Sequence, residues 1–254
     1  MGRAMGWTER QRAMLEEMGV RLWADVRTPL PPAERGEGAA PAAPQPAAHS
    51  AELARGDRPV GIESMDWPAL REAVANCRAC KLCEGRRQTV FGVGNASAHW
   101  MVVGEAPGDQ EDRQGEPFVG KSGQLLDNML RAIGLTRAEA DAAHQVYIAN
   151  TIKCRPPGNR NPEPEELAQC EPFLIRQVEL VRPRIILAMG RFAVQSLLRS
   201  NEPIGKLRGR VHRYQGVPLI VTYHPAYLLR NLDDKARAWD DLCLAMQTLR
   251  TARP

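Results

Sequence analysis

The sequence lacks the features of a membrane or secreted protein. No apolar run approaches the roughly 20 residues that a membrane-spanning helix needs, and the N-terminus has no apolar core like that of a secretory signal. We therefore expect a cytoplasmic protein that does not contact membranes. Because the cytoplasm is reducing, we expect the six cysteines to be metal ligands or buried thiols rather than disulfides.

The sequence also lacks a strong excess of charge of one sign. Its 34 Lys and Arg residues and 30 Asp and Glu residues give a net charge of +4, and the pI is near 8.8. This mild basicity suits an anionic partner but does not identify nucleic acid. The length of 254 residues favours one catalytic domain with a tail.

Three segments of the chain differ in composition. Residues 1–27 carry apolar side chains such as Met14 and Met18 at helical spacing, which predicts a short amphipathic helix. Residues 28–61 are rich in Pro and Ala and are typical of a disordered linker. The folded domain is predicted over residues 62–254.

Short apolar runs alternate with helical patterns along the predicted domain. The runs are typical of buried strands and lie at residues 100–104, 146–150, 184–188 and 218–222. The helical patterns lie at residues 124–133, 164–181, 191–198 and 235–249. This alternation predicts an α/β fold, a three-layer α/β/α sandwich around a mostly parallel four-stranded sheet.

Polar residues stand at the ends of these predicted strands. Glu105 follows the first strand, Asn150 ends the second, Gly190 follows the third and His224 follows the fourth. Open parallel sheets bind ligands beyond the carboxyl ends of their strands. We therefore expect a carboxylate, an amide and an imidazole to converge on one rim.

Four cysteines form two spaced pairs. They are Cys77 and Cys80 with C-x2-C spacing, and Cys154 and Cys170 further along. Four thiolates would form a site for zinc or an iron–sulfur cluster, and buried thiols are the structural alternative. Cys83 extends the spacing of a ferredoxin motif, but Arg87 stands where the fourth cysteine of that motif would fall. We expect Cys83 and Cys243 to be packed or partly exposed thiols.

Residues 115–122 match the phosphate-binding pattern G-x4-G-K-[ST] from Gly115 to Ser122. A P-loop-like NTPase is therefore an alternative function. A phosphate-binding loop of this kind follows an apolar strand, whereas residues 109–114 are polar and charged. The context argues against nucleotide hydrolysis.

Three motifs occur in order along the domain. The first runs from Gly104 through Glu111-Asp112 to Gly120, the second from Asn150 to Arg160, and the third from Tyr223 to Arg230. Together with the spaced cysteines, they resemble family 4 uracil-DNA glycosylases over residues 77–249. The resemblance implies an enzyme of base excision repair that flips uracil out of DNA, hydrolyses its N-glycosidic bond and leaves an abasic site. It also implies a [4Fe–4S] cluster, rather than zinc, on the two cysteine pairs.

The resemblance assigns the residues of the uracil pocket. They are Gly104, Glu105 and Ala106 against the base, Phe118 stacked on it, Asn150 at its pairing edge and His224 beside O2. The Asn150 amide can meet both O4 and N3–H of uracil, and a donor at His224 would stabilise the departing base. We expect Glu105 and His224 to provide most of the rate, with Glu105 orienting water or stabilising the sugar cation. Glu111 is the second candidate for water activation.

Basic residues near the motifs predict the contacts with DNA phosphates. They are Arg155, Arg160, Lys206, Arg208, Arg210, Arg213 and Arg230. Leu228 or Leu229 is expected to wedge into the base stack as uracil leaves. A solvated basic face and a pair of core leucines are the structural alternatives.

Partners beyond DNA can be inferred for the N-terminal segment alone. Residues 10–23 resemble the N-terminal peptide of the polymerase III psi subunit, which implies a replication or repair protein bound by residues 1–27; a helix docked on its own domain is the alternative. We expect a monomer.

A non-catalytic, cluster-bearing DNA-binding module is the rival function. The intact set Glu105, Phe118, Asn150 and His224 argues against it.

Overall fold

Buried apolar strands form the centre of the domain. The computed structural model describes residues 58–251. The strands are β1 (Val93–Gly94), β2 (Trp100–Gly104), β3 (Tyr147–Asn150), β4 (Ile185–Met189), β5 (Val211–Tyr214) and β6 (Val217–Thr222). Every residue of β2, β3 and β4 is buried, as expected for strands covered on both faces of a parallel sheet.

The six strands form one sheet in the order β1-β3-β2-β4-β6-β5. β3, β2, β4 and β6 run parallel, which confirms the predicted parallel core. β1 and β5 pair antiparallel at the two edges and were not predicted. β1 has two residues and β5 is mostly exposed, so neither strand has an apolar run that sequence analysis could detect. The sheet has six strands rather than four.

Helices cover both faces of this sheet. They are η1 (Ile62–Ser64), α2 (Trp67–Asn76), α3 (Leu82–Gly85), α4 (Asp109–Gln114), α5 (Lys121–Ala132), η2 (Pro157–Asn159), α6 (Pro164–Val181), α7 (Arg191–Leu198), α8 (Ile204–Leu207), α9 (Pro225–Leu228) and α10 (Asp234–Thr251). The bounds of α6 and α7 confirm the prediction, and α5 and α10 differ from it by a few residues. The bounds of α2 were not predicted; its N-cap is Asp66, whose side chain accepts from the Ala69 N–H.

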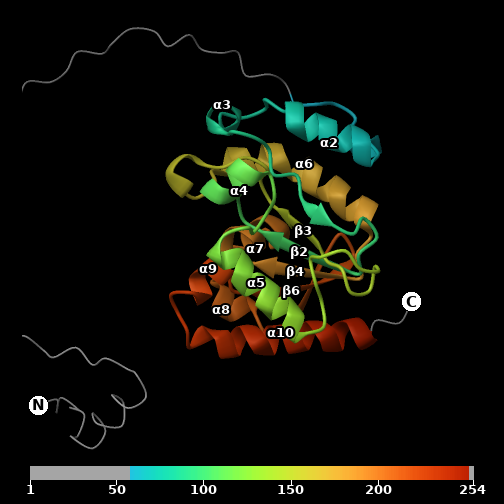
Figure 1. The fold of residues 1–254 in the computed structure, drawn as a ribbon, viewed down its shortest axis with the longest axis vertical. Coiled ribbons are helices and arrows are strands. Elements are labelled where there is room, and N and C mark those ends of the chain that lie inside the picture. The colour runs from blue at the N-terminus through green and yellow to red at the C-terminus, as the bar shows by residue number, and fades with distance from the viewer. Residues whose placement is uncertain (1–57, 252–254) are drawn as a thin grey trace, which may run out of the picture. The chain divides into compact units, whose positions relative to one another are not determined.

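Alternating side chains of the strands divide the core into two layers. Met101 and Val103 of β2 pack with Leu174 of α6 and Val194 of α7. On the opposite face, side chains of the same strand pack with α5 and α10. Figure 1 shows α6 on one side of the sheet and α10 on the other. This arrangement confirms the three-layer sandwich.

The predicted N-terminal helix of residues 1–27 and the predicted linker up to residue 57 lie outside the described residues. Across residues 58–251, no helix combines the length and apolar character required to cross a bilayer.

Candidate active site

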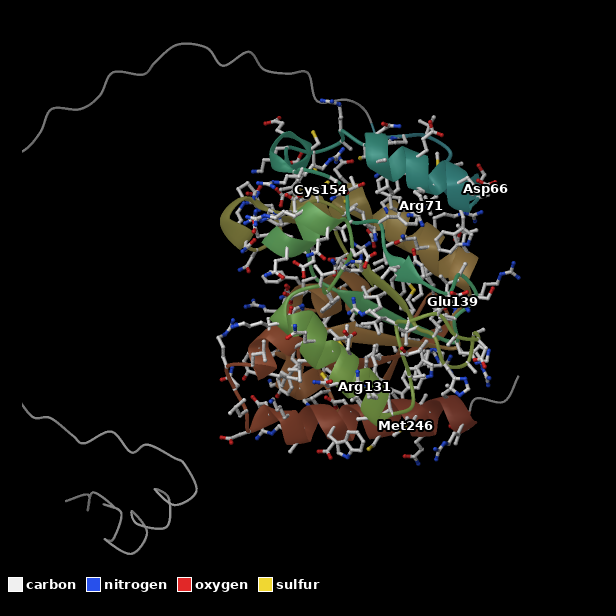
Figure 2. All side chains as sticks on the ribbon, in the orientation of Figure 1. Asp66, Arg71, Arg131, Glu139, Cys154 and Met246 are labelled. Carbon is white, nitrogen blue, oxygen red and sulfur yellow. The ribbon has the colours of Figure 1, made fainter. Side chains whose placement is uncertain are left out.

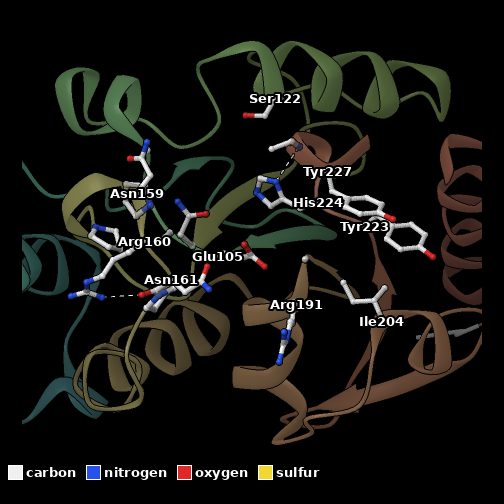
Figure 3. A pocket seen from close by; sticks show the side chains of 18 of the residues that line it. Glu105, Ser122, Asn159, Arg160, Asn161, Arg191, Ile204, Tyr223, His224 and Tyr227 are labelled. Atoms are coloured by element: carbon white, nitrogen blue, oxygen red, sulfur yellow. Dashed lines mark hydrogen bonds between the residues drawn. The ribbon is translucent and has the colours of Figure 1, made fainter. Parts of the chain in front are cut away.

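The carboxyl ends of the parallel strands meet at one rim, as predicted. Gly104 lies opposite Asn150 in the pairing of β2 with β3, and Gly190 follows β4 while His224 follows β6. A cavity of about 960 Å³ opens at this rim, and Glu105, Ala106, Phe118, Asn150 and His224 all line it. Figure 3 shows Glu105 and His224 extending into this cavity; they follow β2 and β6, which lie on either side of β4 in the sheet. The structure therefore brings together five of the six residues predicted for the uracil pocket.

Gly104, the sixth residue, provides space rather than a side chain. A Cβ at this position would lie 2.5 Å from Oδ1 of Asn150 and 2.6 Å from Cζ of Phe118. Such distances are shorter than any van der Waals contact. Glycine is therefore required beside the two residues that are predicted to recognise the base.

Asn150 presents an unpaired polar atom at the rim. Asn150 is 2% exposed. Within the described part of the chain, its Oδ1 has no hydrogen-bond partner. Buried polar atoms are almost always paired in folded proteins, because an unpaired one has lost its bonds to water. The Asn150 amide is thus suited to receive a donor from a ligand.

Phe118 is held in an unusual backbone conformation. Its φ of 55° lies in the left-handed region, and its ring, 4% exposed, stacks on His224 with centroids 5.3 Å apart and an interplanar angle of 24°. A Cβ on Gly123 would lie 1.7 Å from the Phe118 carbonyl oxygen, so α5 can approach the loop only with glycine there. The loop presents an aromatic ring to the cavity.

His224 is neutral at physiological pH. Burial lowers its pKa to about 4, and the positive charge of Arg230 acts in the same direction. The backbone N–H of Ala226 donates to Nδ1 at 3.1 Å, so the ring proton is on Nε2. The imidazole can therefore donate a hydrogen bond without carrying a charge.

Glu105 is anchored to the start of α7. The backbone N–H of Phe192 donates to Oε1 at 2.8 Å. Burial raises the pKa of Glu105, although the backbone N–H groups of Phe192 and Arg191 oppose this effect. A Cβ on Gly190 would lie 2.5 Å from Oε1 of Glu105 and 3.0 Å from Cβ of His224, so this glycine lets the two side chains approach each other.

Glu111 also lines the large cavity, but both of its carboxylate oxygens accept from backbone N–H groups. Its Oε2 accepts from the Gly108 N–H at 3.1 Å, and its Oε1 accepts from the Val119 N–H at 3.1 Å. Glu111 thus links the start of α4 to the loop that carries Phe118. Both carboxylates that sequence analysis proposed for water activation line the cavity.

The phosphate-binding match at residues 115–122 is not a P-loop. Gly115 ends α4 with a φ of 78°, so a helix and not a strand precedes the motif. Phe118 lines the large cavity and packs in one core cluster with Leu126 and Leu130 of α5. The NTPase alternative is not favoured, because residues 115–122 match the motif in sequence but no strand precedes them.

The cysteines of the two predicted pairs line a second, smaller cavity. Its lining includes Cys77, Cys80, Cys154 and Cys170, and also Cys83. Three of the four pack in one cluster with Leu82 and Ile152. Cys170 comes from α6, and Figure 2 shows Cys154 beside that helix. Segments about 90 residues apart are joined here through sulfur-bearing side chains.

The donor set of this second cavity consists of thiols. Four thiolates suit either zinc or an iron–sulfur cluster. Arg86, which sequence analysis did not identify, donates to Sγ of Cys154 at 2.9 Å and to the Cys77 carbonyl. Its guanidinium ties the two cysteine segments together.

Comparison with known protein families assigns the chain to one of them. Residues 91–243 match the model of the uracil DNA glycosylase superfamily. The chain belongs to this superfamily. It is 43% identical to a type-4 uracil-DNA glycosylase of Archaeoglobus fulgidus over 176 residues, 66% of this chain and 84% of the relative. A type-4 uracil-DNA glycosylase of Thermotoga maritima is 42% identical over 168 residues, 65% of this chain and 84% of the relative. A type-5 uracil-DNA glycosylase of Pyrobaculum aerophilum is 34% identical over 146 residues, 53% of this chain and 64% of the relative. The predicted resemblance to the type-4 family is confirmed.

Three arginines that we predicted to contact DNA form ion pairs with other residues of this uracil-DNA glycosylase superfamily member. Arg160 donates to both oxygens of the buried Glu166, at 2.9 and 2.6 Å. Arg208 pairs with the buried Asp241, and Arg155 pairs with Asp109 at 2.6 Å. These guanidinium groups therefore have partners within the chain, although Arg160 also lines the large cavity.

The remaining predicted DNA contacts differ in exposure. Lys206, Arg210 and Arg230 are exposed, and Arg230 lines the large cavity. Arg213 is exposed and donates to the Gly216 carbonyl. The prediction for Leu228 is corrected, because its side chain is 1% exposed and belongs to the core, whereas Leu229 is 42% exposed.

Proposed function

We propose that this protein removes uracil from DNA by hydrolysing the N-glycosidic bond, as a step of base excision repair. The observation that carries the proposal is the buried Oδ1 of Asn150, which lacks a partner among the described residues and faces a cavity lined by Phe118 and His224. The family membership of the chain supports the same reaction. The rival of a non-catalytic module is disfavoured because the cavity retains Glu105 and His224.

Base recognition follows from the hydrogen-bonding pattern of the Asn150 amide. Oδ1 accepts from N3–H of uracil, and the amide nitrogen donates to O4. Cytosine presents the reversed pattern and would leave a buried group unpaired, which is costly. Phe118 stacks on the everted base, as is typical of enzymes that act on flipped nucleotides.

Bond cleavage depends on charge that develops in the transition state. The departing uracil gains negative charge, and Nε2–H of His224 donates to its O2. The sugar gains positive charge, which the carboxylate of Glu105 stabilises while it orients the attacking water. Both side chains are held by backbone N–H groups before substrate binds, so they need little reorganisation.

A [4Fe–4S] cluster on Cys77, Cys80, Cys154 and Cys170 completes the proposal. When bound, the cluster supplies a structural crosslink between the segment around α3, the Cys154 loop and α6. Cys83 lines the same cavity but is not assigned as a ligand.

DNA is proposed to bind across the rim of the large cavity. Lys206, Arg210 and Arg230 are the exposed cations that contact phosphates. Leu229 replaces Leu228 as the residue that enters the base stack, since it is the exposed member of the pair. We retain the proposal that residues 1–27 recruit a replication or repair partner and that the protein acts as a monomer.

The test is the substitution Asn150→Ala, measured on a uracil-containing oligonucleotide under single-turnover conditions. Loss of a base-recognising hydrogen-bond pair should slow excision about tenfold to a thousandfold. The matched control is Asn128→Ala, an exposed residue of α5, which should retain the wild-type rate. Equal rates for the two variants would contradict the assignment of the cavity.

A further inference from the structure

Lys153 lies between the large cavity and the cysteines. It follows β3 three residues after Asn150 and directly precedes Cys154. Although lysine is normally solvated, this residue is 1% exposed and is among the largest fully buried side chains of the described chain. Such a placement requires specific compensation for its charge.

Hydrogen bonds fix the ammonium group of Lys153 in one position. Nζ donates to the Asn150 carbonyl oxygen at 2.8 Å and to Oε1 of Gln177 at 2.7 Å. Gln177, from α6, in turn donates to the Phe91 carbonyl at 2.9 Å and to the Tyr147 hydroxyl at 3.1 Å. The lysine head group therefore belongs to a buried network that includes the backbone of Asn150.

Neither acceptor of this ammonium group carries a charge. A buried cation needs a nearby negative charge, and neutral acceptors compensate it only in part. The cysteines are the nearby groups that could provide this negative charge. Lys153 lines the same small cavity as Cys154 and Cys170, and its backbone N–H donates to the Cys170 thiol. Four thiolates on an iron–sulfur cluster would be net negative and would supply the missing charge.

We infer that Lys153 is a positioning residue that couples the cysteine site to the uracil pocket. The negative charge of the cysteine site compensates its ammonium group, and the hydrogen bond from Nζ fixes the backbone of Asn150. The inference rests on the proposed function, because it takes Asn150 as the uracil-recognising residue and the cysteines as cluster ligands. It goes further by giving the cysteine site an effect on base recognition.

The test uses the full chain, purified with its cluster, and the substitution Lys153→Met. Methionine keeps an unbranched side chain of similar length but has neither the charge nor the donor. The matched control is Lys235→Met, at an exposed position of α10. Two quantities are measured for each protein: the rate at which a chelator bleaches the visible absorption band, and the affinity ratio between duplexes that carry 2′-fluoro-deoxyuridine or thymidine. The 2′-fluorine disfavours the sugar cation and so slows cleavage during the binding measurement.

We expect Lys153→Met to bleach several-fold faster than wild type and to lose about tenfold in the affinity ratio, as for loss of one buried charged hydrogen bond. Stripping the cluster from wild type should lower its affinity ratio to the level of Lys153→Met, and stripping the variant should change little. Lys235→Met should match wild type in both measurements.

A second variant separates charge from packing. Lys153→Arg keeps a positive charge and several donors, so it should bleach at a rate closer to wild type than to Lys153→Met. If the arginine variant bleaches as fast as the methionine variant, or contains no cluster, the role of charge is overturned. If Lys153→Met does not fold, the bleaching rate of Lys153→Arg is compared with that of wild type instead, and this comparison tests the role of charge.

The two proposals fail in different ways. Wild-type protein without iron and without a visible band would overturn the cluster itself. A wild-type band together with wild-type bleaching and affinity ratio in Lys153→Met would overturn the role of Lys153 alone.

Discussion

His224 shows how one side chain is prepared for its role by burial and by a single backbone contact. Its pKa of about 4 lies below the ordinary value of 6.5, so excision should not decline through protonation of His224 above about pH 5. Replacement by alanine should slow excision about 10²- to 10³-fold, as for loss of a preorganised donor. The measurement is the single-turnover rate across pH for wild type and His224→Ala. A decline of the wild-type rate near pH 6.5 that is absent from the variant would contradict a neutral buried imidazole.

The same ionisation affects stability in a defined direction. The unfolded chain takes up a proton on His224 near pH 6.5, whereas the folded chain takes it up only near pH 4. Between these values the unfolded state binds more protons, so the free energy of unfolding decreases as the pH falls through this window. Denaturant unfolding of wild type and His224→Gln at several pH values measures the effect. The glutamine variant should lose less stability on acidification; parallel curves would contradict the assignment.

Glu105 can be tested without disturbing its structural contact. Glu105→Gln keeps an oxygen that accepts a hydrogen bond from the Phe192 N–H. It also removes a carboxylate charge that is unfavourable to bury, as the raised pKa of Glu105 indicates. The variant should therefore be at least as stable as wild type, yet slower in excision by about 10²- to 10⁴-fold. Thermal unfolding and single-turnover excision are measured together. Glu139→Gln, at an exposed position, is the matched control, and a near-wild-type rate for Glu105→Gln would remove this carboxylate from the mechanism.

At the scale of elements, the end of β2 determines the space available to the pocket. Gly104→Ala would place a methyl group against Oδ1 of Asn150 and the ring of Phe118. We expect loss of uracil binding with the sheet intact, because φ of Gly104 does not require glycine. Gly85→Ala is the control, since its added Cβ has nothing within 4 Å. Binding of a uracil analogue and circular dichroism are measured, and wild-type binding by Gly104→Ala would contradict the proposed crowding.

Among the strands, those buried on both faces were the ones that sequence analysis could predict. β2 and β4 have continuous apolar runs, and the residues at their ends could be assigned to one rim because parallel strands share a direction. β1 and β5 escaped prediction because edge strands need no such run. Arg160, Arg208 and Leu228 were assigned to DNA because the local sequence does not show that the two arginines pair with Glu166 and Asp241 or that Leu228 is buried. Lys153 gave no signal either, since its burial depends on packing between β3 and α6.

At the scale of the whole molecule, the cysteines of one cavity come from segments that are distant in sequence, and the proposed cluster would hold these segments together. Cys77→Ser should lose the visible absorption band and lower the midpoint of thermal unfolding, because a cluster that binds the folded state stabilises it. Cys83→Ser, from the same cavity, should keep both the band and the midpoint. Absorption spectra and thermal unfolding of the two variants provide the test. A band lost equally in both would show that the ligand set is wrong.

The central claim is that the rim of the sheet forms a pocket in which uracil is cut from DNA. The direct measurement incubates the protein with a uracil-containing duplex and with a matched thymine duplex, and quantifies the free base by mass spectrometry and abasic sites by alkali cleavage. We predict free uracil and abasic sites in equal amounts from the first duplex and neither from the second. No uracil release above the level of Glu105→Gln would contradict the account.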